Sequence, residues 1–211
     1  GVMRHIFTTT RNSWLMQGLR EALQEDGTEV RVYSVESAGE LLCAAGPRLP
    51  PDSVLLPVFP DNHPVDCLRS LTFLSEWLRL RHSLLVTRAP CILWGHSPLV
   101  RSMPETAGFA VIPWRVSPGR LRSLIADGVA PRRAPGRRRA HVPCRVRLTA
   151  REVTILRHTL EGRSLEWMAG ELGVAAKTVW AHRRRAMDIL GVRRLHDLMQ
   201  LPPEVLCGRP S

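Results

Sequence analysis

The chain of 211 residues lacks the long apolar runs that build membrane-spanning helices, since no stretch of about 18 apolar residues occurs. We expect no secretory leader ahead of the first strand, because no such pattern precedes it in this sequence. The cysteines are odd in number and form no C-x-x-C pair, which disfavours a disulfide framework and a zinc site; they are Cys43, Cys67, Cys91, Cys144 and Cys207. We therefore expect a cytoplasmic protein with reduced thiols and no membrane partner.

Catalytic signatures are missing as well. The sequence shows no paired nucleophile and base, no cluster of metal ligands and no glycine-rich phosphate loop. We therefore expect no enzyme activity, no metal and no cofactor.

Acidic side chains are too few to balance the basic ones: 19 Asp and Glu stand against 30 Lys and Arg, which gives a net charge of +11. Residues 1–130 contain 13 basic and 12 acidic residues, whereas residues 131–211 contain 17 and 7. The excess positive charge therefore belongs to the C-terminal part. A balance this basic suggests an anionic partner, most often nucleic acid and less often an acidic membrane surface or an acidic protein.

The first 128 residues alternate between strand and helix patterns. Short apolar stretches indicate strands at 4–9, 29–35, 52–58, 89–95 and 108–114. Amphipathic stretches indicate helices at 13–27, 37–45, 66–80, 97–103 and 117–128, and HSLLVT at 82–87 also fits a strand. Five strand–helix units predict an α/β fold of the flavodoxin-like kind, with a doubly wound parallel sheet.

Proline, glycine and arginine interrupt this periodicity after residue 128. Residues 129–147 are interpreted as a basic linker between one domain at 1–128 and a second at 148–211. The linker is either a solvated tether or an arm that itself contacts DNA.

Residues 148–211 contain the start and stop signals of four short helices, which predict a small all-α domain. Thr149 and Glu152 form a capping box in TARE, and Ser164 is a candidate N-cap of the second helix. Gly173 makes the turn into a third helix, KTVWAHRRRAMDIL, and the fourth, RLHDLMQL, is stopped by prolines. Two helices joined by a tight glycine turn, the second strongly basic, predict a helix-turn-helix.

The third helix has two unlike faces. Val179, Ala186 and Leu190 share the face that we expect to pack inward. Lys177, Trp180 and Arg184 share the opposite face with Ala181, which suits a helix inserted into the major groove of DNA. Two other interpretations stay open: the run Arg183 to Arg185 is a solvated face, or Trp180 packs on the first helix or on a partner subunit.

The segment from LTARE (148–152) to RRLHDL (193–198) resembles the LuxR-type (GerE/FixJ) DNA-binding domain through LTxRE, TVxxH and LGV. RRRAMDILGV is most similar to the capsule-regulator (Rcs) branch of that family. The resemblance implies base-reading roles for Trp180, Ala181 and Arg184. It implies phosphate contacts for Lys177, Thr178, His182, Arg183, Arg185, Arg193 and Arg194.

The resemblance also implies partners: double-stranded DNA, and a second copy or another LuxR-type regulator in a dimer, while contact with RNA polymerase is compatible with that role. Two residues depart from the family pattern. Ala175 replaces the usual Ser or Thr cap of the recognition helix, at a cost of about 1 kcal/mol. Trp180 replaces a basic base-reading residue, so we expect a different recognised sequence.

The first domain resembles the receiver domain of response regulators, through LxxGLrexL and DSVLL. Such a domain requires carboxylates for Mg²⁺, an aspartate nucleophile, a hydroxyl residue and a lysine. Here the acidic pair falls at Thr10 and Arg11, the nucleophile at Pro57, the hydroxyl at or next to Gly95, and the lysine at or next to Pro113. We therefore expect a degenerate phosphorylation pocket and a non-phosphorylatable pseudo-receiver used for dimerisation or partner binding.

Together these patterns predict a bacterial sequence-specific DNA-binding transcription regulator, with activation implied only by the family. Three alternatives stay open: a regulator switched by phosphorylation, one gated by a small ligand, and an auxiliary protein that binds another regulator instead of DNA. Trp94 and Trp114 either line a ligand pocket or pack in the core.

Overall fold

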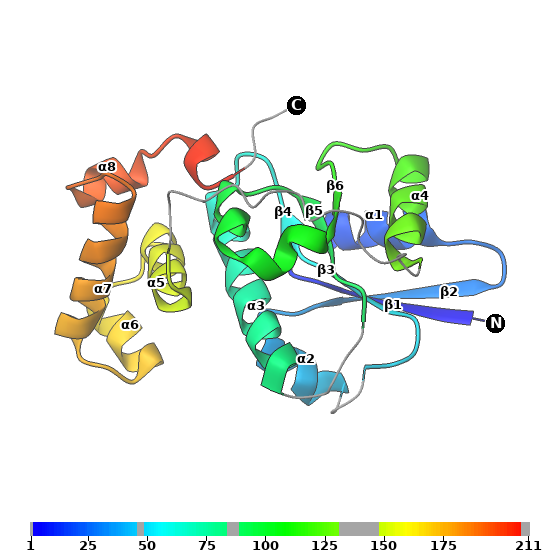
Figure 1. Ribbon diagram of the computed structural model, residues 1–211, viewed down its shortest axis with the longest axis horizontal. Coiled ribbons are helices and arrows are strands. Elements are labelled where there is room, and N and C mark those ends of the chain that lie inside the picture. The colour runs from blue at the N-terminus through cyan, green and yellow to red at the C-terminus, as the bar shows by residue number, and fades with distance from the viewer. Residues whose placement is uncertain (1, 46–48, 84–88, 131–147, 208–211) are drawn as a thin grey trace.

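A computed structural model describes residues 2–45, 49–83, 89–130 and 148–207. An α/β part is followed by a helical part (Figure 1). Most of the expected linker and of the HSLLVT stretch lies outside the described residues. No helix in the described ranges is both long enough and apolar enough to cross a bilayer.

The sheet consists of parallel strands only, among the residues described. Two groups of strands pair in the orders β2-β1-β3 and β4-β5-β6. The strands are β1 (Val2–Thr8), β2 (Thr28–Ser34), β3 (Ser53–Leu56), β4 (Val58–Phe59), β5 (Ile92–Gly95) and β6 (Ala110–Ile112).

The third expected strand is interrupted at Pro57, which separates β3 from β4. Proline has no backbone N–H, so the ladder of hydrogen bonds is broken at this residue. The two groups still join at this point, because Leu55 N donates to Pro90 O at 2.9 Å and Trp94 N donates to Pro57 O at 3.0 Å. The combined order, β2-β1-β3/β4-β5-β6, is the flavodoxin-like order that the sequence predicts.

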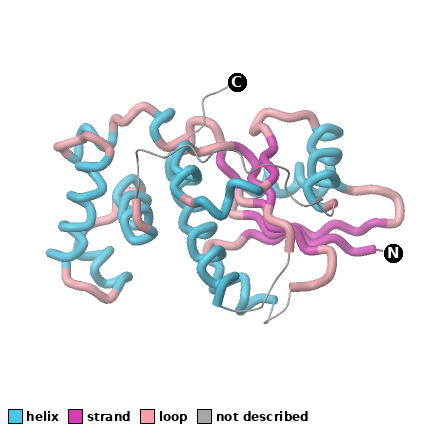
Figure 2. Tube along the Cα trace, viewed as in Figure 1, coloured by secondary structure: helices cyan, strands magenta, loops and turns pink. Residues whose placement is uncertain are grey.

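Helices cover both faces of this sheet (Figure 2). Helices α1 (Ser13–Leu23) and α4 (Pro118–Val129) contact each other on one face, and α2 (Ala38–Ala45) and α3 (Pro64–Ser83) contact each other on the other. Side chains alternate accordingly: on β1, Ile6 packs into the cluster under α1 and α4, whereas Phe7 packs into the cluster under α2 and α3. The predicted doubly wound α/β fold is confirmed.

One predicted helix is different in the structure. Instead of a single α-helix at 97–103, two 3₁₀ turns follow β5, η1 (Pro98–Ser102) and η2 (Pro104–Gly108). Pro104 cannot continue the hydrogen bonding of the first turn, and Thr106 Oγ1 donates to Met103 O at 2.8 Å to close the second.

The helical part begins and ends its helices where the sequence signals predict. Thr149 and Glu152 form the expected capping box, Ser164 caps the second helix, and Gly173 has φ +65° at the turn. The elements are α5 (Ala150–Leu160), α6 (Leu165–Leu172), α7 (Ala176–Ile189), α8 (Leu195–Met199) and η3 (Pro203–Val205).

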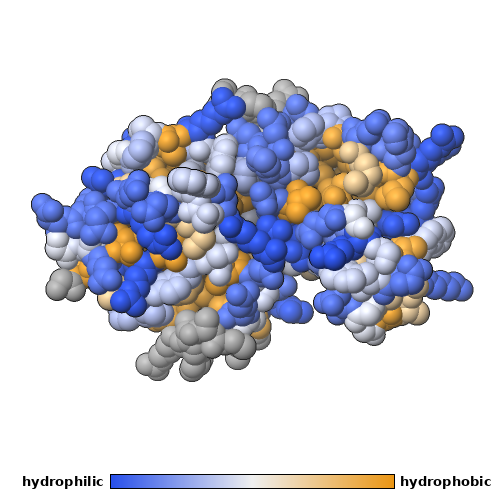
Figure 3. Space-filling model, turned by 180° about the vertical axis from the view of Figure 1, so that it is seen from behind, coloured by the Kyte–Doolittle hydropathy of each residue, from blue (hydrophilic) through white to orange (hydrophobic). Residues whose placement is uncertain are grey.

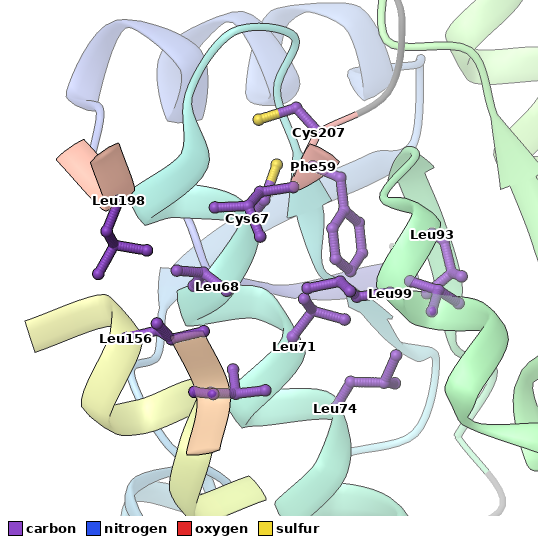
Figure 4. Close-up of a cluster of buried hydrophobic side chains, with 14 of the residues drawn as sticks. Phe59, Cys67, Leu68, Leu71, Leu74, Leu93, Leu99, Leu156, Leu198 and Cys207 are labelled. Atoms are coloured by element: carbon purple, nitrogen blue, oxygen red, sulfur yellow. The ribbon is translucent and has the colours of Figure 1, made fainter. Parts of the chain in front are cut away.

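The two parts meet where α5 packs against α3. One apolar cluster crosses this junction and joins Leu68, Leu71 and Leu74 of α3 to Leu156 of α5 and Leu198 of α8 (Figure 4). All five of these leucine side chains are buried. Helix α5 therefore lies between α3 and α7, and it contacts both.

Candidate nucleic-acid interface

Helix α7 is anchored by its apolar face, as predicted. Val179 and Ala186 are fully buried, Met187 is 5% exposed, and Leu190 is partly buried against the junction cluster. These side chains pack against α5 and α6. The supporting helices thus fix the orientation of α7 and of the side chains on its other face.

The start of α7 lacks a side-chain cap. Ala175 occupies the N-cap position and makes no side-chain hydrogen bond, as the sequence predicts. Helix N-termini leave several backbone N–H groups without an intrahelical partner, and these groups attract anions. The amino end of α7 therefore suits contact with a phosphate group.

Four of the predicted contact residues lie exposed at the amino half of α7: Lys177, Thr178, Trp180 and Ala181. Trp180 is 53% exposed, although tryptophan is usually buried for the most part. Packing of Trp180 into the first helix is therefore not what the structure shows. An indole and a cation on one exposed helix face form a surface that suits a nucleic-acid groove.

Arg184 lies beside the turn that leads to α8. Its Nη1 donates to the carbonyl oxygen of Arg193 at 2.8 Å, and its Nε is 3.5 Å from Oδ1 of Asp188. These contacts limit the rotamers of an arginine that is still 42% exposed at its side chain. Asp188 and the Arg193 carbonyl are positioning partners that sequence analysis missed.

A hollow of about 120 Å³ lies next to Arg184. It has apolar and cationic walls, formed by Trp180, Arg183, Arg184, Met187, Arg193 and Leu195. His182 and Arg183 are partly buried on α7, while Arg193 and Arg194 are exposed at the turn before α8. Of the predicted phosphate-binding residues, Arg183 and Arg193 line this hollow.

Arg185 has a different environment. Its Nη1 contacts Oε1 of Glu152, a carboxylate that is only 1% exposed. Glu152 also accepts a hydrogen bond from Thr149 N at 3.1 Å through its other oxygen. The positive charge of Arg185 is therefore paired within the protein, and this contact competes with its predicted role at a phosphate.

The predicted remnants of the phosphorylation pocket lie at the carboxyl edge of the sheet. Thr10 is 6% exposed and its hydroxyl accepts from Asn12 N at 3.1 Å, whereas exposed Arg11 forms an ion pair with Glu36. Mg²⁺ prefers several oxygen ligands, usually including carboxylates. A buried, engaged hydroxyl and a guanidinium do not fit this ion.

A hydrogen-bond network next to Pro57 was missed by sequence analysis. Thr9 Oγ1 lies 2.6 Å from Ser70 Oγ and accepts from Val58 N at 3.0 Å, and the Ser70 hydroxyl donates to Val58 O at 2.5 Å. Thr9 and Ser70 are both buried. The network fixes the backbone after Pro57, and it engages the Thr9 and Ser70 hydroxyl groups beside this predicted nucleophile position.

The strand ends at β5 and β6 are closed by packing. Gly95 has φ +94°, and a Cβ there would lie 2.0 Å from the carbonyl oxygen of Phe59. Trp94 is buried, packs against Trp114 with ring centroids 4.8 Å apart and ring planes tilted by 40°, and donates through Nε1 to Pro113 O at 3.2 Å. Of the two roles considered for these tryptophans, the structure shows core packing.

Comparison with known proteins gives a family for the helical part. Residues 146–201 match the GerE model, described as bacterial regulatory proteins of the luxR family. No curated protein sequence matches the chain.

Several solved structures share the fold of both parts. RcsB from Salmonella enterica serovar Typhimurium, bound to promoter rprA in the presence of the phosphomimetic BeF3⁻, has a TM-score of 0.58 at 16% identity, over 95% of this chain and 98% of that one. The RcsB response regulator of Salmonella typhimurium in a study of conformational dynamism for DNA interaction has a TM-score of 0.59 at 15% identity, over 98% and 100%. Two RcsB dimers bound to two parallel DNAs give 0.58 at 16% identity, over 99% and 100%.

At these identities the solved structures show the fold, and the family match covers the helix-turn-helix. The chain therefore combines a receiver-like α/β fold with, at residues 146–201, a GerE-type helix-turn-helix domain of the LuxR family of bacterial regulatory proteins.

Proposed function

We propose that this protein is a sequence-specific transcription regulator that inserts α7 into the major groove of DNA. The observation that carries the proposal is the exposed face of α7, where Lys177, Trp180 and Ala181 stand on a helix whose other face is buried. The positive charge of residues 131–211 supplies the attraction to phosphates. The RcsB proteins of similar fold are bound to DNA in their solved structures, which supports the same partner for this chain.

Within this proposal Trp180, Ala181 and Arg184 read bases. On binding DNA, Arg184 would either release Asp188 and the Arg193 carbonyl to pair with the edge of a guanine, or keep these two contacts to hold its guanidinium in position against that edge. Lys177, Thr178, His182, Arg183, Arg193 and Arg194 contact phosphates. One guanidinium nitrogen of Arg185 is engaged by Glu152. Arg185 can therefore contact a phosphate only through its other N–H groups.

The α/β part (1–128) acts in this proposal as a pseudo-receiver, connected to the DNA-binding domain (148–211) by a basic linker (129–147). Thr10, Arg11 and Pro57 do not supply the groups that phosphorylation requires, so dimerisation or contact with a partner regulator replaces phosphorylation as its role. Large apolar side chains are exposed on both parts: Trp14, Val111, Leu195 and Met199. Figure 3 shows apolar areas within a mostly hydrophilic surface on one face of the molecule. Exposed apolar areas of this kind are where a second subunit would bind.

Selection from a random pool of DNA duplexes tests the proposal. The full chain is incubated with the pool, bound duplexes are sequenced, and the cycle is repeated. We expect an enriched sequence with two half-sites about one helical turn apart, because a two-fold dimer contacts successive major grooves on one side of DNA. Enrichment of no sequence over the input pool would contradict sequence-specific binding.

The same selection with Trp180→Ala tests the assigned reading face. We expect a changed preference at one or two positions of the half-site. Arg120→Ala provides a matched control, because Arg120 is an exposed arginine on α4 of the other domain. The control variant should enrich the wild-type sequence.

A further inference from the structure

Two cysteines from distant parts of the chain meet at the junction between the α/β part and the helical part. Cys67 lies near the amino end of α3, and Cys207 follows η3. Both residues are fully buried and belong to the apolar cluster that crosses the junction. Figure 4 shows the two side chains side by side at one end of that cluster.

The two thiols are neighbours in this cluster (Figure 4). The Cys67 Sγ–H donates to the carbonyl oxygen of Pro60 at 3.4 Å. The segment that contains Cys207 is fastened in place, because Ser97 Oγ donates to Leu206 O at 2.8 Å and Cys207 N donates to Pro203 O at 2.7 Å. The two sulfur atoms are thus kept together by the fold of both parts.

The two thiols are unequal. The adjacent Cys67 thiol and the backbone N–H of His63 outweigh the effect of burial and lower the pKa of Cys207. The proximity of Cys207, together with burial, raises the pKa of Cys67. Since the thiolate is the reactive form, Cys207 is suited to be the attacking sulfur and Cys67 the second one.

Cys91 has a contrasting environment. Burial raises its pKa to about 12, so that it stays a thiol at neutral pH. It directly precedes β5 and packs against two apolar clusters, the one at the junction and the one under α2 and α3. Cys91 therefore serves as a matched control.

We propose that Cys67 and Cys207 form an oxidative modification site, a dithiol that a hydroperoxide converts into a disulfide joining α3 to the carboxyl end of the helical part. This inference goes beyond DNA binding and does not depend on it. The bond would prevent the DNA-binding domain from separating from α3, because it closes a covalent link across the junction.

The chemistry balances in two steps. The Cys207 thiolate attacks one oxygen of the hydroperoxide, which breaks the O–O bond, leaves a sulfenic acid and, after protonation, releases water or an alcohol. The Cys67 sulfur then attacks the Cys207 sulfur, the S–O bond breaks, and the thiol proton leaves with the hydroxide as water. The two thiols lose two electrons and two protons, and the peroxide accepts them.

Hydrogen peroxide is a suitable probe, because this small, uncharged molecule reaches buried thiols during brief local openings. The purified full chain is treated with hydrogen peroxide and its intact mass is measured. The remaining free thiols are then blocked, and the protein is digested without reduction for peptide mass spectrometry. We expect the intact mass to fall by two hydrogen atoms and one linked peptide pair to contain Cys67 and Cys207. Dithiothreitol should reverse both changes.

Variants separate this site from the other cysteines. Cys67→Ser and Cys207→Ser should each abolish the mass loss, whereas Cys91→Ser should leave it unchanged. Circular dichroism verifies that each variant is folded, and the peptide map of the wild-type protein tests the pairing without any substitution. A second readout is thermal unfolding, for which we expect oxidation to raise the midpoint by roughly 10 °C, since the bond closes a long loop.

Two results would overturn the proposal. One is that both cysteines of the folded wild-type protein are recovered as free thiols after peroxide treatment. Oxidation of exposed methionines such as Met199 in the same sample shows that the treatment was sufficient. The other is a disulfide that joins either cysteine to Cys43, Cys91 or Cys144 in the folded protein.

Discussion

Individual side chains of the neighbouring helices hold α7 in position, and Glu152 on α5 is the clearest case. This carboxylate is 1% exposed, completes the capping box of α5 with Thr149, and contacts Arg185 on α7. It therefore connects the start of one helix to the middle of another. A buried carboxylate is tolerated only when hydrogen bonds of this kind satisfy its oxygens.

Replacement of Glu152 by Ala should destabilise the helical part by about 2–3 kcal/mol, because the backbone N–H of Thr149 loses its acceptor and α5 loses a cap. Urea denaturation followed by circular dichroism measures this change. Thr149→Ala should cost about 1 kcal/mol, and Glu171→Gln, at an exposed position, less than about 0.5 kcal/mol. Equal changes in the free energy of unfolding for Glu152→Ala and Glu171→Gln would show that the buried hydrogen bonds of Glu152 do not stabilise the helical part.

Gly95 is a second residue on which the sheet depends. Because φ is +94° and an added Cβ would meet the backbone of Phe59, Gly95→Ala should destabilise the α/β part by at least about 3 kcal/mol. Gly119→Ala is the control, since that exposed helical glycine has nothing within 4 Å of a built Cβ. The control should be neutral or slightly stabilising. A similar unfolding midpoint for both variants would contradict the close approach of β5 to β4.

At the scale of elements, local signals predicted most of the architecture. Thr149, Ser164 and Gly173 mark helix ends through contacts within a few residues of sequence, so the helices of the DNA-binding domain could be located without a structure. The contacts of Arg184 with the Arg193 carbonyl and of Arg185 with Glu152 could not be predicted, because they depend on how α7 is placed against α5 and the turn before α8. The pair of 3₁₀ turns after β5 could not be predicted either, because Pro104 and tertiary packing set their form.

The residues at the carboxyl ends of the strands lead us to expect that the α/β part is not phosphorylated. With Thr10, Arg11 and Pro57 in place of the Mg²⁺ carboxylates and the aspartate nucleophile, incubation with acetyl phosphate and Mg²⁺ should give no phosphoprotein on a phosphate-affinity gel. The hydroxyl groups of Thr9 and Ser70 are buried and hydrogen-bonded, so they should not substitute as nucleophiles. A shifted band that is stable enough to map to a residue of the α/β part would reject the pseudo-receiver.

At the scale of the whole molecule, α3 connects the two parts. Its side chains are buried on opposite sides, with Phe73 and Trp77 packed against α2 and the sheet, and Leu71 and Leu74 in the junction cluster. The apolar residues of α3 therefore form two stripes, and the leucine stripe in its sequence is a signal for a second contact surface. The sequence does not identify the partner of that surface, which the structure shows to be α5.

This arrangement has a consequence for DNA binding. Because α5 lies between α3 and α7, the α/β part does not cover α7 (Figure 1), and Trp180 on this helix is exposed. The proposed recognition helix is therefore accessible in the arrangement described. The full chain should therefore bind its DNA without a phosphoryl donor.

Binding without a phosphoryl donor can be measured by fluorescence anisotropy. The full chain is titrated with the enriched duplex in the presence and absence of acetyl phosphate and Mg²⁺. We expect the same Kd in both conditions, a loss of roughly 10- to 100-fold in preference over a mismatched duplex for Arg184→Ala, and unchanged binding for Arg120→Ala. Lys177→Ala should weaken binding to both duplexes and flatten the salt dependence by about one phosphate contact. Binding that requires the phosphoryl donor would rule out a pseudo-receiver, and equal binding by Arg184→Ala, Lys177→Ala and the wild-type protein would rule out α7 as the helix that contacts DNA.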